Sequence, residues 1–333
     1  MSVQYIRKFS IVILLLALFA MLAACGQGPD SKAKSDPTSS VQSPGSDNSK
    51  QTLPGNETMI YQTADGKVEI PKNPQRIVEL SDSYVGHLLA LGIKPVGITQ
   101  HAMDNPYFKG RLDGVENLGD GKSIEKILEL QPDLIITFSG DAAFTDELSK
   151  IAPTVTIEYG KLPVREQLLE FGKMTGREDR ARAWIAEWDQ KIAGYKPKIE
   201  AAVGDKTVSI LQPYAKGIYA FGHNYGRGGE ILYGEFKLKA PSPIQKEAID
   251  NGKGWASLSL EVLPEYAGDF IFTSPWTGDD GDPDVVYGSS LWKKLPAVKN
   301  NRVFALVKDG SFFNDPVSLE GQLEFIVESL TGK

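Results

Sequence analysis

The stretch from residue 176 to 203 constrains the fold of this chain more than any other. It reads GREDRARAWIAEWDQKIAGYKPKIEAAV. Its apolar side chains recur every three or four residues, which is typical of a helix that buries one face: Ala181, Trp184, Ile185, Trp188, Ile192, Tyr195, Ile199 and Ala202. Such a helix is about 40 Å long, enough to cross a whole domain. Gly194 and Pro197 predict a kink near its middle, because the apolar spacing resumes beyond them.

Blocks of similar size flank this helix, and in both of them short apolar runs alternate with helical patterns. Before the helix we expect strands at 76–80, 95–99, 133–138 and 154–157. After it the apolar segments are 207–211, 229–233, 258–265, 269–273 and 302–306, followed by a last helix at 316–330. Alternation of this kind favours parallel sheets covered by helices. The pattern predicts an α/β protein with lobes at 58–175 and 204–333 joined by the helix, although a long surface helix on a single domain would leave the same stripe.

The first residues carry an export signal rather than part of the fold. Arg7 and Lys8 precede an apolar run from 9 to 22, which is shorter than the roughly 20 residues that span a bilayer. The sequence Leu-Ala-Ala-Cys then ends at Cys25 and resembles a bacterial lipobox, in which the cysteine receives lipid and becomes the new N-terminus. The alternative is a secretory signal, residues 1–24, followed by an incidental cysteine.

Composition constrains what the mature chain can bind. Cys25 is the only cysteine, so lipidation would leave no free thiol and no internal disulfide. Without residues 1–24 the chain has 34 Lys and Arg against 43 Asp and Glu, a net charge of −9, which argues against nucleic acid and against broad attraction to anionic lipid. Residues 25–57 are rich in Ser, Pro, Gly and charged residues, so we expect a disordered tether there.

One unit of sequence occurs on both sides of the long helix. Ser123-Ile124-Glu125 leads to Glu129 and the strand 133–137, and Ser259-Leu260-Glu261 leads to Glu265 and the strand 269–273, each pair 136 residues apart. A serine-capped helix with acids in its first turn accounts for the residue types. It does not account for one complete unit in each half, so the repeat favours two related lobes.

Four segments in order, behind a lipobox, point to a family: PQRIVELSDSYVGHLLALGIKPVGI, SIEKILELQPDLIITF, GHNYGRGGEILY and FFNDPVSLEGQLEFIVESL. They resemble the ferric siderophore-binding lipoproteins of bacterial ABC importers, in particular the Gram-positive ferric hydroxamate binders. The resemblance implies two three-layer αβα lobes with mostly parallel sheets, bridged by one long helix, with the ligand in the cleft between them. It also implies a non-catalytic monomer, anchored by lipid on Cys25 at the extracytoplasmic face of the cell membrane.

The same resemblance assigns residues to the cleft. It implies that Tyr219, Tyr225 and Arg227 line it, and that the planar Arg227 fork donates to hydroxamate oxygens. The chain departs from the pattern at Tyr225, where Trp is common, and at Phe138, where Tyr often follows the strand. Further candidates are aromatic or His side chains near predicted strand ends, where α/β proteins bind ligands, with simple packing as the alternative: Tyr84, His101, Trp276, Phe312 and Phe313.

Metal and partner expectations follow from the same family. A siderophore fills the coordination sphere of Fe³⁺ with its own oxygens, so no protein ligand to the metal and no further cofactor is expected. His87, His101 and His223 are far apart in sequence, unlike the clustered His and carboxylates of relatives that bind bare zinc or manganese. The resemblance implies that Glu125 and Glu261 dock on arginine pockets of an ABC permease dimer, which is driven by a cytoplasmic ATPase.

Other ligands and one other class of protein remain open. The ligand could be a citrate-based or catecholate ferric siderophore, haem or cobalamin, although an anionic catecholate complex calls for several convergent bases and Arg227 is the one that the motif places. An exported lipid-anchored hydrolase is the alternative from another class. The chain has no GxSxG or HExxH motif, but a Ser-His-Asp site could still assemble around His101 or His223.

Overall fold

The computed structural model of the protein describes residues 57–275, 278 and 280–332. The predicted signal, Cys25 and almost all of the predicted tether lie outside these residues, and so does Trp276. Within the described part of the chain, no helix is both long and apolar enough to cross a membrane.

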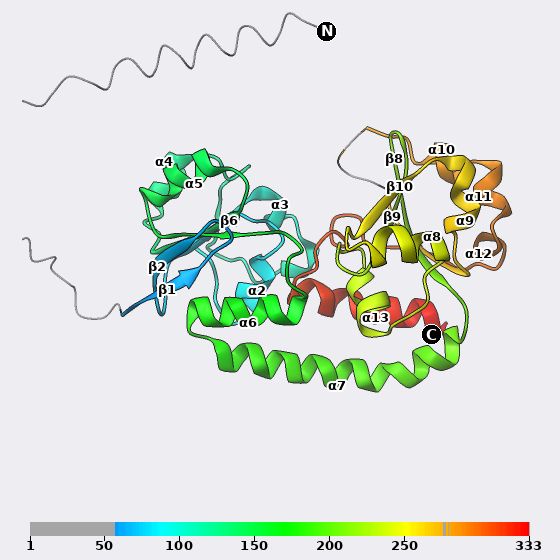
Figure 1. Cartoon of the computed structure of the whole chain (residues 1–333), viewed down its shortest axis with the longest axis horizontal. Helices are drawn as coiled ribbons and strands as arrows, with labels where there is room; N and C mark the ends of the chain where they lie inside the picture. Colours follow the sequence, from blue (N-terminus) through cyan, green and yellow to red (C-terminus); the bar gives the residue numbers. More distant parts are fainter. Residues whose placement is uncertain (1–56, 276–277, 279, 333) are drawn as a thin grey trace, which may run out of the picture. The chain divides into compact units, whose positions relative to one another are not determined.

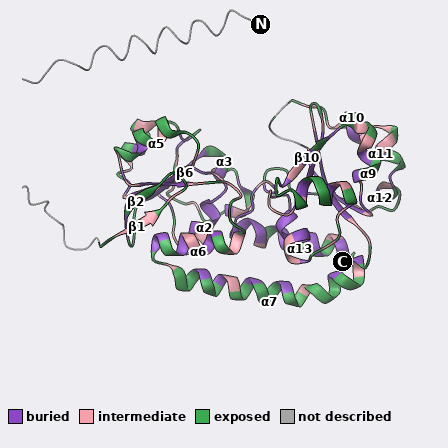
Figure 2. Ribbon diagram, viewed as in Figure 1, coloured by how far each residue is buried: buried purple, intermediate pink, exposed green. Residues whose placement is uncertain are grey.

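The predicted long helix is present as α7, Glu178–Val203, and it lies along one side of the molecule beneath both lobes (Figure 1). Five of its six buried residues come from the predicted stripe, with Val203 as the exception, and they include Trp184 and Trp188, whose rings stack with centroids 5.4 Å apart. Pro197 lies inside the helix and does not end it, and the ribbon bends over its C-terminal part (Figure 1). Figure 2 shows buried residues along the face that α7 turns toward the lobes and exposed residues on the other face.

The first lobe has a five-stranded sheet in which every neighbouring pair is parallel, as predicted. The strand order is β5-β4-β3-β6-β7, and the strands are β3 (Ile77–Glu79), β4 (Gly97–Ile98), β5 (Glu116–Asn117), β6 (Leu134–Phe138) and β7 (Thr154–Ile157). The helices of this lobe are α2 (Val85–Ala90), α3 (Gln100–Met103), η1 (Pro106–Phe108), α4 (Ile124–Glu129), α5 (Ala142–Ser149) and α6 (Val164–Thr175). A separate antiparallel hairpin, β1 (Thr58–Gln62) and β2 (Lys67–Pro71), precedes the sheet.

The second lobe has a mixed sheet, so the predicted parallel pairing holds for only part of it. Its order is β10-β9-β8-β11-β12, with β8 (Val208–Tyr214), β9 (Gly217–Phe221), β10 (Trp255–Leu258), β11 (Phe270–Thr273) and β12 (Val303–Ala305). β11 pairs in parallel with both β8 and β12, whereas β9 pairs antiparallel with both β8 and β10. Tyr214 pairs with Gly217, so only two residues connect β8 to β9, and so short a connection joins only antiparallel strands.

Short helices surround this second sheet. They are η2 (Glu230–Glu235), α8 (Ser242–Ile244), η3 (Gln245–Asp250), η4 (Leu260–Val262), α9 (Leu263–Tyr266), α10 (Asp284–Tyr287), α11 (Ser290–Lys294) and α12 (Pro296–Lys299), followed by the longer α13 (Pro316–Thr331). η2 and η3 are π-helices, a form often found at functional sites.

The repeated sequence unit has corresponding places in the two sheets. It leads into β6 in the first lobe and into β11 in the second, and each strand lies fourth in its sheet order. Each pairs in parallel with the first strand of its lobe's βαβ pattern, β6 with β3 and β11 with β8. The helices differ: Ser123 caps α4, whereas Ser259 precedes a 3₁₀ turn and makes no capping bond to the backbone. The two units therefore occupy corresponding positions before the fourth strand of each sheet, but they form different types of helix.

The start of α13 packs against the first lobe although it comes last in the chain. Asp315 caps α13 and lies so close to Gly86 of α2 that a Cβ on this glycine would be 1.6 Å from the carboxylate. Asn105 donates from Nδ2 to Ser318 Oγ at 2.8 Å. Buried apolar residues of α7, α13 and both sheets form one continuous core cluster. The lobes thus share a core at the base of the space between them.

Candidate ligand-binding cleft

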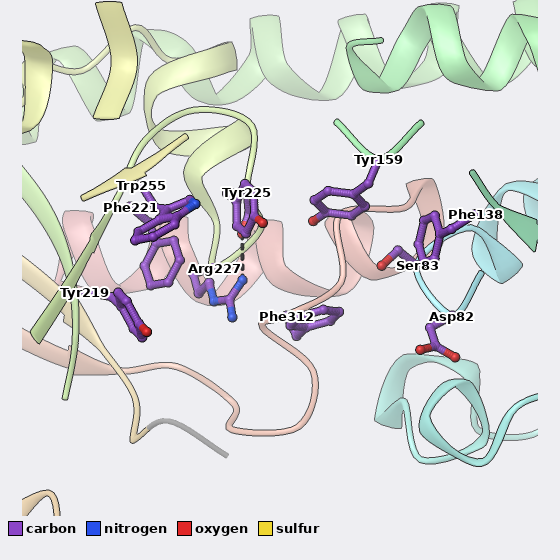
Figure 3. A pocket seen from close by; sticks show the side chains of 10 residues that line it. All are labelled: Asp82, Ser83, Phe138, Tyr159, Tyr219, Phe221, Tyr225, Arg227, Trp255 and Phe312. Carbon is purple, nitrogen blue, oxygen red and sulfur yellow. Dashed lines mark hydrogen bonds between the residues drawn. The ribbon is translucent and has the colours of Figure 1, made fainter. Parts of the chain in front are cut away.

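A cavity of about 420 Å³ opens between the two lobes (Figure 3). Seven of its ten lining residues are aromatic, which suits a bulky ligand with apolar surface. The first lobe contributes Asp82, Ser83, Phe138 and Tyr159, and the later part of the chain contributes Tyr219, Phe221, Tyr225, Arg227, Trp255 and Phe312.

The aromatic wall of the second lobe follows from strand geometry. Tyr219 and Phe221 are two residues apart on β9, so their side chains lie on one face of the sheet. Trp255 on β10 pairs with Phe221 in the antiparallel register, and its ring meets Tyr219 edge-on with centroids 5.5 Å apart. Tyr214 stacks on Tyr219 at 4.0 Å from the other side. The rings thus hold one another in place before any ligand arrives.

Arg227 is fixed at the centre of this wall. Its backbone has φ +58°, and its side chain is almost completely buried. The guanidinium donates from Nη1 to the Tyr225 carbonyl oxygen at 2.8 Å and from Nε to Gln212 Oε1 at 3.3 Å. It also lies over two rings, Phe221 at 4.3 Å and Phe312 at 4.9 Å. Burial lowers the Arg227 pKa to about 10, so the group is a cation at neutral pH.

The turn that carries Arg227 requires glycine before it. Gly226 has φ +73°, and a Cβ there would lie 2.3 Å from the Phe312 carbonyl oxygen. Glu230, in the first turn of η2, accepts from the Gly226 amide at 3.0 Å and from Asn314 Nδ2 at 2.8 Å. Burial raises the pKa of this carboxyl. The buried Glu230 therefore ties the arginine turn to the segment that precedes α13.

The first-lobe wall consists of rings that reach toward the second lobe. Phe138 ends β6 and contacts Tyr159 edge-on, with centroids 5.8 Å apart. Tyr159 follows β7 and contacts Tyr225 of the second lobe at 5.3 Å, so the two walls meet through this pair. Burial raises the pKa of the Tyr159 hydroxyl.

Five of the predicted cleft residues line this cavity: Phe138, Tyr219, Tyr225, Arg227 and Phe312. Three others do not. Tyr84 is buried behind Phe138 at 5.8 Å, with its hydroxyl accepting from the Gly160 amide. Phe313 is fully buried, and its ring lies 6.2 Å from that of Phe108. His101 is half exposed and lies beside Phe312 at 5.0 Å, outside the lining, and Trp276 lies outside the described residues.

Five lining residues were not predicted from the sequence: Asp82, Ser83, Tyr159, Phe221 and Trp255. Phe221 could have been found from its place two residues beyond Tyr219, and Tyr159 from its place just after a predicted strand. Trp255 gave no local signal, since it reaches the cavity only through the pairing of β10 with β9. Among the described residues, no three His, Cys, Asp or Glu side chains gather closely enough to hold a metal ion.

The two predicted docking glutamates are exposed, one in each lobe. Glu125 lies in the first turn of α4, two residues after the cap residue Ser123. Glu261 lies in η4 and receives a hydrogen bond from Ser259, which lowers the pKa of Glu261.

Comparison with known proteins gives one consistent family. Residues 77–309 match the family model described as "Periplasmic binding protein". The iron(3+)-hydroxamate-binding protein FhuD of Bacillus subtilis is 48% identical over 327 residues, 98% of each chain. A FhuD-fold periplasmic binding protein component of a Fep/Fec-like ferrichrome ABC transporter from Bacillus subtilis superposes with a TM-score of 0.77 and 51% identity over 82% of this chain and 100% of that one.

A ligand-bound structure is also similar. FhuD2 of Staphylococcus aureus with bound ferrioxamine B matches with a TM-score of 0.71 and 33% identity, covering 78% of this chain and 99% of that one. The two Bacillus subtilis relatives are named as binding proteins, and the superposed structures share the two-lobed α/β fold described above. The chain therefore belongs to the periplasmic binding protein family, with the FhuD fold.

Proposed function

We propose that this chain is an extracytoplasmic solute-binding lipoprotein that captures a ferric hydroxamate siderophore between its lobes and delivers it to an ABC importer. The observation that carries the proposal is the Arg227 guanidinium, held among aromatic rings at the inter-lobe cavity. Hydroxamate oxygens carry negative charge and accept charge-assisted hydrogen bonds from such a fork. The 48% identity to a protein named for iron(3+)-hydroxamate binding supports the same ligand class.

The protein's part in iron recognition is to fit the outside of a complex that is already formed. Siderophore oxygens complete the coordination of Fe³⁺, so the cavity supplies shape, ring surface and donors, and no side chain binds the metal. Arg227 donates to the hydroxamate oxygens, and Tyr219, Tyr225, Phe138 and Phe312 pack on the ligand. Trp276 remains a further candidate for this surface. The cycle consists of binding, docking and release, without covalent chemistry.

Delivery requires an anchor and a docking surface. Residues 1–24 direct export, Cys25 carries the lipid at the outer face of the cell membrane, and residues 25–57 form the tether. Glu125 and Glu261 contact the two permease subunits, one from each lobe. A two-fold permease needs two similar contacts, and the repeated unit supplies them at corresponding places in the two lobes. The boundaries 58–175, 176–203 and 204–333 describe the lobes and the bridge.

Tryptophan fluorescence tests the proposal directly, because Trp255 lines the cavity and a ferric complex bound there should quench it. We expect saturable quenching of the purified mature protein by ferrichrome and ferrioxamine B. Ferric enterobactin and a ferric citrate complex should bind much more weakly, and esters and phosphates should not be turned over. The proposal is wrong if no hydroxamate complex binds, or if the catecholate binds better than the hydroxamates.

A further inference from the structure

Asp82 gives the cavity a negative pole on the side opposite Arg227. Figure 3 shows its carboxylate on the first-lobe side of the cavity, with Phe312 between it and the Arg227 side chain. We propose that Asp82 selects among ferric hydroxamates by charge and favours those with a free ammonium group remote from the iron. This inference rests on the proposed function, since it concerns which hydroxamate complex the same cleft prefers.

The carboxylate is held in one position. Asp82 follows β3 with φ +37°, a conformation that costs free energy and that Asp tolerates better than most residues. The Thr99 hydroxyl donates to Asp82 Oδ1. Thr99 is itself fixed, because as the cap of α3 its hydroxyl also accepts from the Ala102 amide at 3.3 Å. A charge held in this way is ready to meet a ligand without first being ordered.

His101 lies beside Asp82 and does not neutralise the Asp82 charge when the pH is above the pKa of His101. His101 Nδ1 lies 3.4 Å from Asp82 Oδ2, and both side chains are partly open to solvent. The hydrogen bond with Asp82 raises the pKa of His101, with smaller contributions from Asp104 and Asp309. At a pH above this raised pKa the imidazole is neutral, so Asp82 then presents a full negative charge at the cavity.

The charge of the ligand decides which pole it meets. Three hydroxamate groups balance the charge of Fe³⁺, so the core of such a complex is neutral overall, with its negative partial charge on the oxygens. Arg227 attracts those oxygens on the second-lobe side. A remote ammonium would be drawn to Asp82 across a cavity lined mostly by rings, whereas a remote carboxylate would be repelled. The expected order of affinity is ammonium, then neutral, then carboxylate.

Two probes that differ by one charge test this order. Ferrioxamine B has a terminal ammonium that takes no part in iron coordination, and N-acetylation removes that charge while leaving the iron core unchanged. By calorimetry at pH 8 and low salt, the wild-type protein should bind ferrioxamine B about 3–10-fold more tightly than its acetylated form. Asp82→Asn should abolish this preference. Asn tolerates the same backbone conformation and can still accept from Thr99, so it is a matched replacement.

The outcomes separate the inference from the proposed function. Equal affinity of the wild-type protein for the two probes, or an equal loss for both in Asp82→Asn, would overturn the role of Asp82 and leave hydroxamate binding intact. If neither probe nor neutral ferrichrome binds the wild-type protein, the proposed function falls, and this inference with it. The unfolding temperature of Asp82→Asn should match that of the wild type, which would show that the change in preference does not come from a loss of folding. If the variant does not fold, the wild-type protein alone supplies the test. Its preference for ferrioxamine B over the acetylated form must then shrink as salt is added, and a preference that does not change with salt would contradict the inference.

Discussion

Arg165 and Glu235 form a two-pronged ion pair that connects the first lobe to the second. Arg165 Nη1 lies 2.5 Å from Glu235 Oε1, and Nη2 lies 2.8 Å from Oε2. Arg165 belongs to α6 and Glu235 ends η2, so the pair joins elements that are 70 residues apart. The bridging helix α7 is hydrogen-bonded to each partner of this ion pair. Asp189 accepts from Arg165 Nη2 at 2.6 Å, and Trp188 donates from Nε1 to Glu235 Oε1 at 2.9 Å.

Replacing Arg165 by Ala should destabilise the protein, because Glu235 is mostly buried and would keep only the Trp188 bond. We expect the free energy of unfolding to fall by about 1–3 kcal/mol, toward the lower end because Arg165 itself is one-third exposed and partly screened. Chemical denaturation measures this change. Arg182→Ala is the matched control, since its pair with Glu178 is exposed and long at 3.9 Å, and it should change stability by less than about 0.5 kcal/mol. Equal effects of the two substitutions would contradict a special role for Arg165.

Replacing Arg227 should weaken hydroxamate binding without abolishing the cavity. Arg227→Ala removes a charge-assisted donor and should cost about 1–3 kcal/mol of binding free energy. Arg227→Lys keeps the charge but lacks the planar fork, so its loss should be intermediate. Titration with ferrichrome gives both values. Arg302→Ala, whose side chain lies over the Phe270 ring at 5.0 Å and outside the cavity lining, should leave the dissociation constant unchanged, and an unchanged constant in Arg227→Ala would remove that residue from the site.

The parts of the fold that could be predicted are those with a local pattern. The helical spacing of Trp184, Trp188 and Ile192 requires one buried face whatever that face packs on, and α7 has it. The motif around Arg227 is also local, because it spans only a few residues. The resemblance could therefore place Tyr225 and Arg227 at the cleft, and both line the cavity. The repeated units that contain Glu125 and Glu261 lead into strands at matching places in the two sheets, as the repeat suggested. The second unit contains a 3₁₀ turn where the first contains an α-helix.

The parts that could not be predicted depend on pairings between distant residues. The antiparallel half of the second sheet depends on the pairing of β9 with β10, which places Trp255 opposite Phe221. The sequence around these two residues does not specify this pairing. In the same way, Asp315 meets Gly86 only because α13 returns to the first lobe. Tyr84 shows the reverse case, since an aromatic ring after a strand suits a ligand site or a core equally well, and here neighbouring rings bury it.

Removing both proposed docking glutamates should separate transport from binding. In cells that rely on this protein for ferric hydroxamate uptake, the double variant Glu125→Ala with Glu261→Ala should lose uptake of radiolabelled iron, and each single variant should lose part of it. Both side chains are exposed, so ligand affinity of the purified variants should be unchanged. Glu129→Ala with Glu265→Ala is the matched control, because these exposed acids belong to the same repeated unit. Equal loss of uptake in the control, or reduced ligand affinity in the test variant, would contradict specific docking.

The stability of the protein should depend on pH through the buried Glu79. This residue ends β3 without exposure, and its Oε1 accepts from the Ser81 amide at 2.8 Å and from the Ser81 hydroxyl. Burial raises the pKa of Glu79 to about 8, from an ordinary value of 4.5. Between these two pH values the folded protein keeps a proton that the unfolded chain has lost. The stabilising contribution of Glu79 is therefore complete below about pH 4.5 and is lost as the pH rises toward 8.

Glu79→Gln should flatten this dependence, because the amide cannot ionise. Urea unfolding at pH 6.5 and 7.5 should show the wild-type protein losing at most about 1.4 kcal/mol per pH unit, and the variant losing less. Asp315, whose pKa burial raises to about 6, contributes a slope of the same sign below that pH, so the comparison belongs above it. Glu116→Gln, an exposed substitution on the edge strand β5, should keep the wild-type slope. Parallel slopes for the wild-type protein and Glu79→Gln would mean that Glu79 is ionised in the folded protein throughout this range.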